Sequence, residues 1–109
     1  MADTFKVLAQ SAPSAASLTD IYTVPGATSA VISTIVVVNT SSPSTTFRIS
    51  IQVANAADNI KQYLYYDTII GGNDTFVATL GITLAATDVI AVYATLATLS
   101  FNVFGVEIT

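Results

Sequence analysis

The chain contains no cysteine, no histidine and no tryptophan, and its only basic residues are Lys6, Arg48 and Lys61. Without histidine, nucleophilic catalysis has lost its usual general base, and without cysteine there are no disulfides and no thiolate ligands for zinc. A Ser–Lys dyad with Lys6 or Lys61 is still conceivable, but both lysines lie in polar, surface-type contexts. We therefore expect that the protein is not an enzyme and that it binds no cofactor.

Charge is scarce throughout the chain. Charged residues make up 9% of the 109 residues, against roughly 25% in ordinary soluble domains, whereas apolar residues make up 52%. The formal net charge is −4, and three cations cannot neutralise many phosphates, so we expect no nucleic-acid partner. A monomer needs charge to stay dispersed. Copies of the chain, or another partner, are therefore expected to cover part of its apolar surface, with a Ser/Thr-coated monomer as the alternative.

Membrane insertion and export are not indicated. The longest unbroken apolar run, residues 89–94, is much shorter than the roughly 20 residues that a membrane-spanning helix needs. Residues 1–6 do not show the basic region followed by an apolar segment that marks a signal peptide. We expect no membrane partner and synthesis in the cytoplasm of a host cell, where a chain without cysteine needs no oxidising environment.

Apolar and polar residues alternate with a period of two, and turn signals interrupt them at short intervals, which is typical of an all-β protein. No segment has a helical apolar period between capping residues, so little or no helix is expected. We predict one antiparallel β-sandwich of the jelly-roll type over residues 18–109. Its fourth strand is expected to be wet on the face of Arg48, Ser50 and Gln52. The seven to eight expected strands cover residues 5–9, 18–24, 29–39, 47–53, 60–70, 75–80, 89–95 and 99–108.

Residues 1–17 form the other predicted unit, an extended arm or first strand. Residues 10–17 are small and polar, which indicates a connector between a short first strand and the main body. The apolar residues Phe5, Val7 and Leu8 could pair as an added strand on the edge of a partner's sheet. On this interpretation, removal of residues 1–17 leaves the sandwich folded and abolishes binding to the partner.

Carboxylates are the only candidates for metal binding or acid–base chemistry. They lie at strand ends and turns, where aspartate is favoured because its side chain accepts hydrogen bonds from nearby backbone amides. None belongs to an alternating acidic loop of the kind that binds calcium. We predict no metal, with a structural cation as the alternative. The groups considered are Asp67 with Asp74, Asp20 with Asp88, and the pairs at residues 58–59 and 73–74.

Aromatic residues gather in two places. Tyr63, Tyr65 and Tyr66 share one expected strand, in which alternation puts Tyr63 and Tyr65 on one face and Tyr66 on the other. A row of tyrosines could form a sugar-binding platform, but a core or subunit contact is the favoured interpretation. Truncating a buried aromatic residue is expected to cost a few kcal/mol. The candidate interface residues are Phe5, Val7, Leu8, Tyr93, Phe101 and Phe104.

Residues 84–93 and 100–106 resemble the C-terminal ends of tumour-necrosis-factor-like and complement-type trimeric jelly rolls. Those proteins have a Leu-x-x-Gly-Asp-x-Val pattern followed by a final strand with Ser-x-Phe-x-Gly. In this chain Thr87 replaces the glycine before Asp88, and the Phe-to-Gly spacing is shifted unless Phe104 is the counterpart. This resemblance implies a jelly-roll fold and a homotrimer.

The whole chain also resembles small structural proteins of tailed bacteriophages, cyanophages included. The matching stretches are residues 21–25, 33–39, 46–50 and 74–76. This resemblance implies a virion component, most simply a capsid decoration (cement) protein that lies on the particle surface and binds the phage major capsid protein. The alternatives are a tail, baseplate or fibre module and a carbohydrate-binding β-sandwich module.

Overall fold

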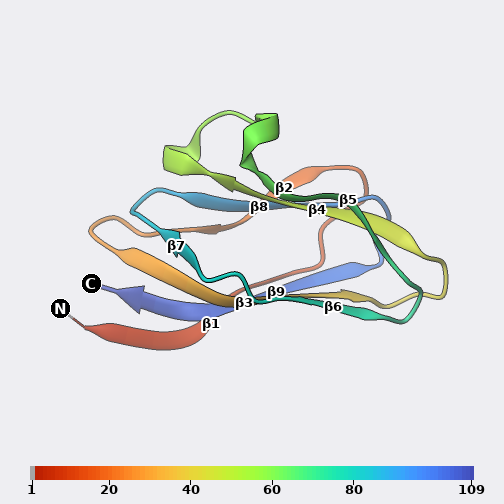
Figure 1. Cartoon of the computed structure of the whole chain (residues 1–109), viewed down its shortest axis with the longest axis horizontal. Coiled ribbons are helices and arrows are strands. Elements are labelled where there is room, and N and C mark those ends of the chain that lie inside the picture. Colours follow the sequence, from red (N-terminus) through yellow and green to blue (C-terminus); the bar gives the residue numbers. More distant parts are fainter. Residues whose placement is uncertain (1) are drawn as a thin grey trace.

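A computed structural model describes residues 2–109 and shows two antiparallel sheets packed face to face (Figure 1). Sheet A consists of β1 (Asp3–Ser11), β9 (Leu99–Ile108), β3 (Ser29–Asn39), β6 (Thr75–Ala78) and β7 (Ile82–Leu84). Sheet B consists of β2 (Leu18–Thr23), β8 (Val89–Ala94), β4 (Thr45–Gln52) and β5 (Tyr63–Ile70). The other elements are two single 3-10 turns, η1 (Val53–Asn55) and η2 (Ile60–Gln62). The prediction of a β-sandwich is confirmed.

The strand order is that of a jelly roll. Sheet A has the order β1-β9-β3-β6, with β7 also pairing with β3, and sheet B has the order β2-β8-β4-β5. β6 and β7 pair with successive parts of β3 and behave as one strand interrupted near Gly81, whose φ is 64°. If they are counted together, the chain crosses between the sheets at every connection except that from β4 to β5. This interruption raises the strand count to nine, above the seven to eight expected.

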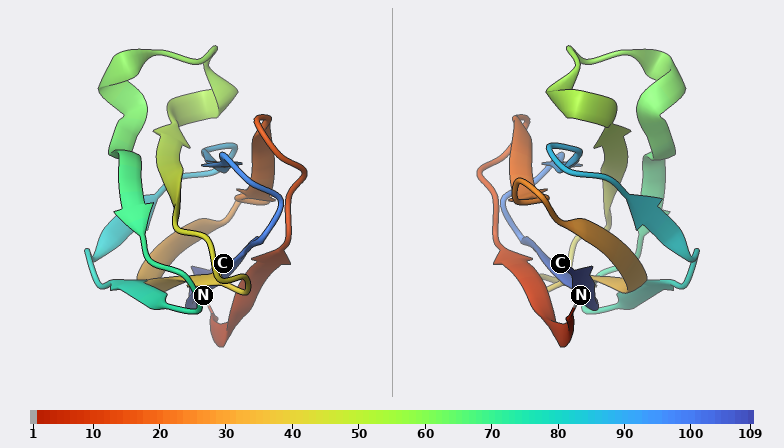
Figure 2. Two further views of the ribbon diagram at one scale, coloured as in Figure 1. Left: turned by 90° about the vertical axis from the view of Figure 1, so that its right-hand side faces the viewer. Right: turned by 90° about the vertical axis from the view of Figure 1, so that its left-hand side faces the viewer.

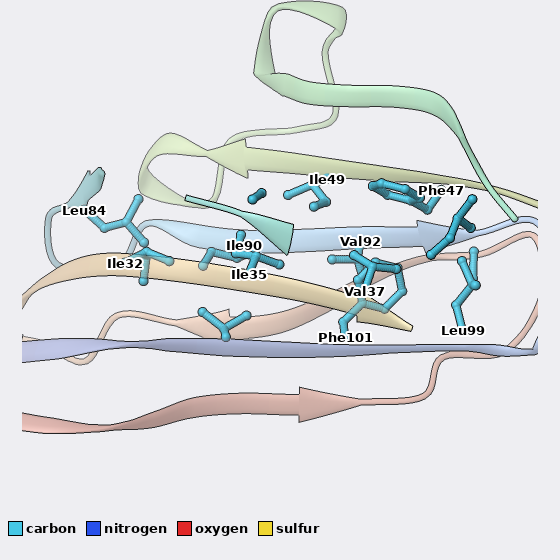
Figure 3. Close-up of a cluster of buried hydrophobic side chains, with 14 of the residues drawn as sticks. Ile32, Ile35, Val37, Phe47, Ile49, Leu84, Ile90, Val92, Leu99 and Phe101 are labelled. Carbon is cyan, nitrogen blue, oxygen red and sulfur yellow. The ribbon is translucent and has the colours of Figure 1, made fainter. Parts of the chain in front are cut away.

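The hydrophobic core lies between the two sheets and is drawn in Figure 3. The four inner strands supply it, because alternate residues of each point to the same face. The fully buried large side chains include Ile32, Ile35, Val37, Phe47, Ile49, Ile90, Val92, Leu99, Phe101 and Val103. The expectation of a wet face on β4 was wrong for Ser50 and Gln52, which are buried. Residues 53–62 fold back over that end of β4, where η1 contacts β8 and η2 contacts β4.

β1 is an integral edge strand of sheet A. It pairs with β9 from Asp3 opposite Ile108 to Ser11 opposite Phe101, and Leu8 packs against the core. The predicted connector therefore begins too early, because residues 10 and 11 belong to the strand. Met1 lies outside the described residues. Since β1 covers one edge of β9, deleting residues 1–17 is expected to destabilise the sandwich, contrary to the expectation for a free arm.

A charged cluster connects β1 with β9 of its own sheet and with β2 of sheet B. The Lys6 Nζ atom lies 2.7 Å from Oε1 of Glu107 on β9, and the Tyr22 hydroxyl on β2 donates to Glu107 Oε2 at 2.6 Å. The hydrogen bonds from Lys6 and Tyr22 hold the pKa of Glu107 below its usual value. Burial, together with the bond to Glu107, raises the pKa of Tyr22. One carboxylate thus links β1, β9 and β2.

The turn before β8 carries backbone strain. Asp88 is buried, and its two carboxylate oxygens accept hydrogen bonds from the backbone amides of Ala54, at 2.8 Å, and Ala85, at 2.9 Å. Thr87, which stands where the resembling trimeric proteins have glycine, has a φ of 69°. A β-branched residue in the left-handed region is an outlier that costs about 1–2 kcal/mol. The Asp88 carboxylate and the hydrogen bond from the Thr87 amide to the Val24 carbonyl hold the turn in this conformation.

We expect the Thr87→Gly variant to be more stable than the parent chain by about 1 kcal/mol, because glycine adopts the left-handed conformation without steric cost. Urea unfolding measures this change. It is monitored by far-ultraviolet circular dichroism, because the chain has no tryptophan for fluorescence. The matched control is Thr79→Gly, at an exposed threonine outside the left-handed region, where added backbone freedom should lower stability. Equal destabilisation by both variants would show that the turn is not strained.

Candidate assembly surface

The outer face of sheet A consists of side chains from all of its strands arranged in cross-strand rows. One row contains Phe5, Val106 and Val31, and the next contains Val7, Phe104 and Thr34. Two further rows follow along β3. They contain Gln10, Asn102, Val36 and Val77, and then Ser100, Val38 and Thr75. Because each row alternates with the buried positions of the same strands, all these side chains face away from the core.

This outer face is apolar and nearly free of charge. Phe5 is 79% exposed and Val77 is 58% exposed, while Val7 is also exposed. The four rows contain no acidic or basic side chain. Asp3, opposite Ile108, lies beyond these rows at one corner of the sheet. The polar members of the rows are neutral, and the Gln10 side-chain amide donates to Asn102 Oδ1 at 2.8 Å. We call these four rows the sheet A surface.

The size of the sheet A surface matters for what it can bind. Strands lie about 4.8 Å apart and rise about 3.3 Å per residue, so four strands over seven residues cover roughly 450 Å² in projection. Two such areas total roughly 900 Å², slightly below the roughly 1,000 Å² that specific protein interfaces exceed, so a stable contact between copies has to extend beyond the four rows. A patch of this extent is comparable to the largest patch on a typical soluble monomer, and such patches are often functional.

The candidate interface residues divide into three groups. Phe5, Val7 and Phe104 come together on the sheet A surface. Leu8 lies at the β-bulge between Val7 and Ala9 and packs against the core. Phe101 was wrongly assigned to the interface: it is 0% exposed and contacts Phe47 across the core, with 6.4 Å between ring centroids.

Tyr93, the remaining candidate, belongs to a second cluster on the outer face of sheet B. The Arg48 guanidinium carbon lies 4.2 Å from the ring centroids of both Tyr66 and Tyr93. Arg48 Nε also donates to Asp67 Oδ1 at 2.7 Å, which raises the pKa of the guanidinium. Arg48 therefore clasps β4, β5 and β8 together. We call Arg48, Tyr66, Tyr93 and Asp67 the arginine clasp.

The position of Tyr66 in the clasp corrects the expected alternation. Two register shifts interrupt the pairing of β4 with β5, on either side of Ile49, and Asp67 has a φ of 50°. These bulges turn Tyr66 to the same face as Tyr63, and the two rings meet edge to face with centroids 5.0 Å apart. Tyr65 packs instead against Phe76 and Phe47 in the sandwich.

The clasp leaves little room for a sugar. In a carbohydrate platform the ligand stacks on free aromatic faces, whereas Arg48 already occupies one face of Tyr66 and one of Tyr93. The Tyr63 hydroxyl donates to Asp58 Oδ1 at 2.9 Å, and burial and this bond raise its pKa. The Tyr63 hydroxyl and the Asp58 carboxylate, two groups that could recognise a sugar, are therefore paired with each other.

The carboxylates of the described chain do not gather into a metal site. Within residues 2–109 no cluster of three or more potential metal-ligating side chains occurs. Asp88 and Asp74 accept hydrogen bonds from backbone amides at turns, which is the local role expected of them. None of the helical turns described is long and apolar enough to cross a membrane.

Comparison with protein-family models, with curated proteins and with solved structures finds no match to this chain. The role of the protein therefore has to be argued from its own surfaces. Sequence reasoning found Val7 but missed the other valines of the sheet A surface, although a signal for them exists. Residues 35–38 are a continuous β-branched run, which is the pattern of a strand covered on both faces.

We expect Arg48→Ala to lower the free energy of unfolding by about 1–2 kcal/mol, because it removes a charge-assisted hydrogen bond and two cation–π contacts. Arg48→Lys should recover only part of this loss, since an ammonium group cannot form the planar contacts. Lys61→Ala, at a lysine without an ion pair among residues 2–109, serves as control. Equal stability of Arg48→Ala and the control, measured by urea unfolding, would show that the clasp contributes nothing.

Proposed function

We propose that the protein is a non-catalytic structural component of a virus particle, a capsid decoration protein that assembles as a homotrimer and binds the assembled phage head. The observation that carries this proposal is the sheet A surface. It is a broad apolar face, built on a rigid sandwich, with no charge in its four rows.

Electrostatics favour a second copy of the chain as the occupant of this surface. The chain has a net charge of −4, so identical copies repel one another wherever their acidic residues meet. The sheet A surface is where copies can approach with the smallest electrostatic cost. Binding costs its β-branched residues little side-chain entropy, because their χ1 angles are already restricted in the free protein. The run of residues 35–38 would then be covered on both faces.

The assignment to a virion rests on the resemblance of residues 21–25, 33–39, 46–50 and 74–76 to small phage structural proteins. A tail or baseplate module with the same fold is the second candidate. The carbohydrate-binding alternative has less support, because the arginine clasp occupies the tyrosine faces.

The proposed assembly is tested with two separate variants, one with a lysine added to sheet A and one with a lysine added to sheet B. Val77→Lys puts a like charge on every copy of the sheet A surface, and it should convert the trimer to a monomer at micromolar concentration in analytical ultracentrifugation. Ile69→Lys is the matched control, because Ile69 is 74% exposed on an edge strand of sheet B. This variant should remain trimeric. A parent chain that is monomeric, or equal effects of the two variants, would contradict the proposal. Thermal melts of both variants establish that each is folded.

The virion assignment is tested separately with particles purified from the culture that naturally expresses the chain. Gold-labelled antibodies against the protein should decorate intact heads, and the purified protein should co-sediment with heads stripped of it but not with free coat subunits. A lattice of assembled subunits presents a composite surface that a single subunit lacks. Label confined to tails would favour the tail-module alternative, and particles without label would overturn both.

A further inference from the structure

Residues 53–62 form a separate feature on the outer side of sheet B. They leave β4 at Gln52, make the turns η1 and η2, and return as β5. Figure 2 shows this segment, in green, at the opposite side of the molecule from β1, in red. A pocket of about 550 Å³ opens here, lined by Ile51, Val53, Ala56, Lys61 and Gln62. We call it the η pocket.

The walls of the η pocket are held in a strained conformation. Ala54 and Asn55 have φ values of 52° and 57°, and left-handed residues other than glycine cost about 1 kcal/mol or more each. The Asp88 carboxylate accepts from the Ala54 amide and fixes the first turn. Asn59 and Gln62 cap the second turn reciprocally: Asn59 Oδ1 accepts from the Lys61 amide at 3.1 Å and Gln62 Oε1 from the Asn59 amide at 3.0 Å. Strain that neighbouring groups maintain in this way is typical of binding sites.

The segment exposes large apolar side chains beside the pocket. Val53 is 65% exposed, and Ile60 is 83% exposed. The side chain of Gln62 makes two hydrogen bonds: its Nε2 donates to the Ala57 carbonyl at 3.0 Å, and its Oε1 accepts from the Asn59 amide. The lining is therefore mainly apolar, with Lys61 and Gln62 as its polar members.

Lys61 differs from the other two basic residues. Lys6 forms an ion pair with Glu107, and Arg48 forms one with Asp67, both at 2.7 Å. Lys61 has no ion-pair partner among residues 2–109 and lines the η pocket. In a chain with a net charge of −4, the one basic side chain of residues 2–109 without an ion pair therefore lies at the edge of a mainly apolar pocket. An apolar group that carries a carboxylate complements both features.

We propose that the η pocket docks an acidic segment of another polypeptide, which places a large apolar side chain against Ile51 and Val53 and an adjacent carboxylate on Lys61. A single lysine is too little to hold an anionic lipid surface, which is recognised by clusters of about four to eight basic residues, whereas one lysine suffices to pair with one carboxylate. Residues 53–62 lie on the opposite side of the molecule from β1 of sheet A (Figure 2). The inference stands on the pocket alone and does not depend on the virion assignment.

The test is a titration of the ¹⁵N-labelled full chain with short blocked peptides. Binding is monitored by nuclear magnetic resonance, through the chemical shifts of the backbone amides. Acetyl-Ala-Leu-Glu-Ala-amide should shift the amides of residues 51–62 in a saturable way. Acetyl-Ala-Leu-Gln-Ala-amide, which lacks only the carboxylate, should bind about two- to fivefold more weakly, as expected for loss of an exposed ion pair. Lys61→Gln should abolish this difference, Lys61→Arg should keep it, and Ala56→Leu should block both peptides by filling the pocket.

Three results would overturn the inference. The first is the absence of shifts in residues 51–62 up to the solubility limit of the peptides. The second is equal affinity of the two peptides for the parent chain. The third is saturable binding of decanoate without binding of either peptide, which would make the pocket a fatty-acid site. The spectra themselves establish that each variant is folded, and the oligomeric state, measured on the same samples, keeps the outcome separate from that of the assembly proposal.

Discussion

Sheet A carries apolar side chains on both of its faces, and this constraint organises the rest of the molecule. On β3, Ile35 and Val37 point into the core while Val36 and Val38 point outward, and β9 places Phe104 and Val106 on the same outer face. Sheet B covers only the inner face. Its own outer side carries the charged arginine clasp and residues 53–62, and Ile69 there is 74% exposed. The two sides of the sandwich are therefore unlike in charge: the outer rows of sheet A have none.

Two buried polar side chains, one near each end of the sandwich, accept or donate hydrogen bonds that hold the loops there. At one end Asp88 accepts from two backbone amides, one of which belongs to residues 53–62. At the other end the buried Asn39 amide donates to the carbonyls of Pro43 and Gly71 and accepts from the Ser41 amide and the Thr98 hydroxyl. All the donors and acceptors of the Asn39 amide that the geometry allows are thereby used. These two residues hold the loops that join the sheets.

Much of the fold could be predicted from the sequence, because alternation and turn residues are local signals. The strand expected over residues 29–39 was found with those bounds, and the jelly-roll order followed. Alternation could not show which of Phe101 and Phe104 points inward, since a strand covered on both faces is apolar on both. The bulges that turn Tyr66 outward and the strained segment after Gln52 depend on tertiary contacts with β4 and β8. The sheet A surface was thus only partly foreseen, and the η pocket was not foreseen at all.

The central claim is that the outer face of sheet A is covered by copies of the same chain. It is tested most directly by photo-cross-linking of the purified protein with p-benzoylphenylalanine in place of Phe104 on sheet A or, as control, of Tyr66 on sheet B. Irradiation should join chains from position 104, with the covalent bond falling on residues of β3, β6 or β9 of another copy in mass spectrometry of the digest. Cross-links between copies from position 66 and none from position 104 would contradict the account.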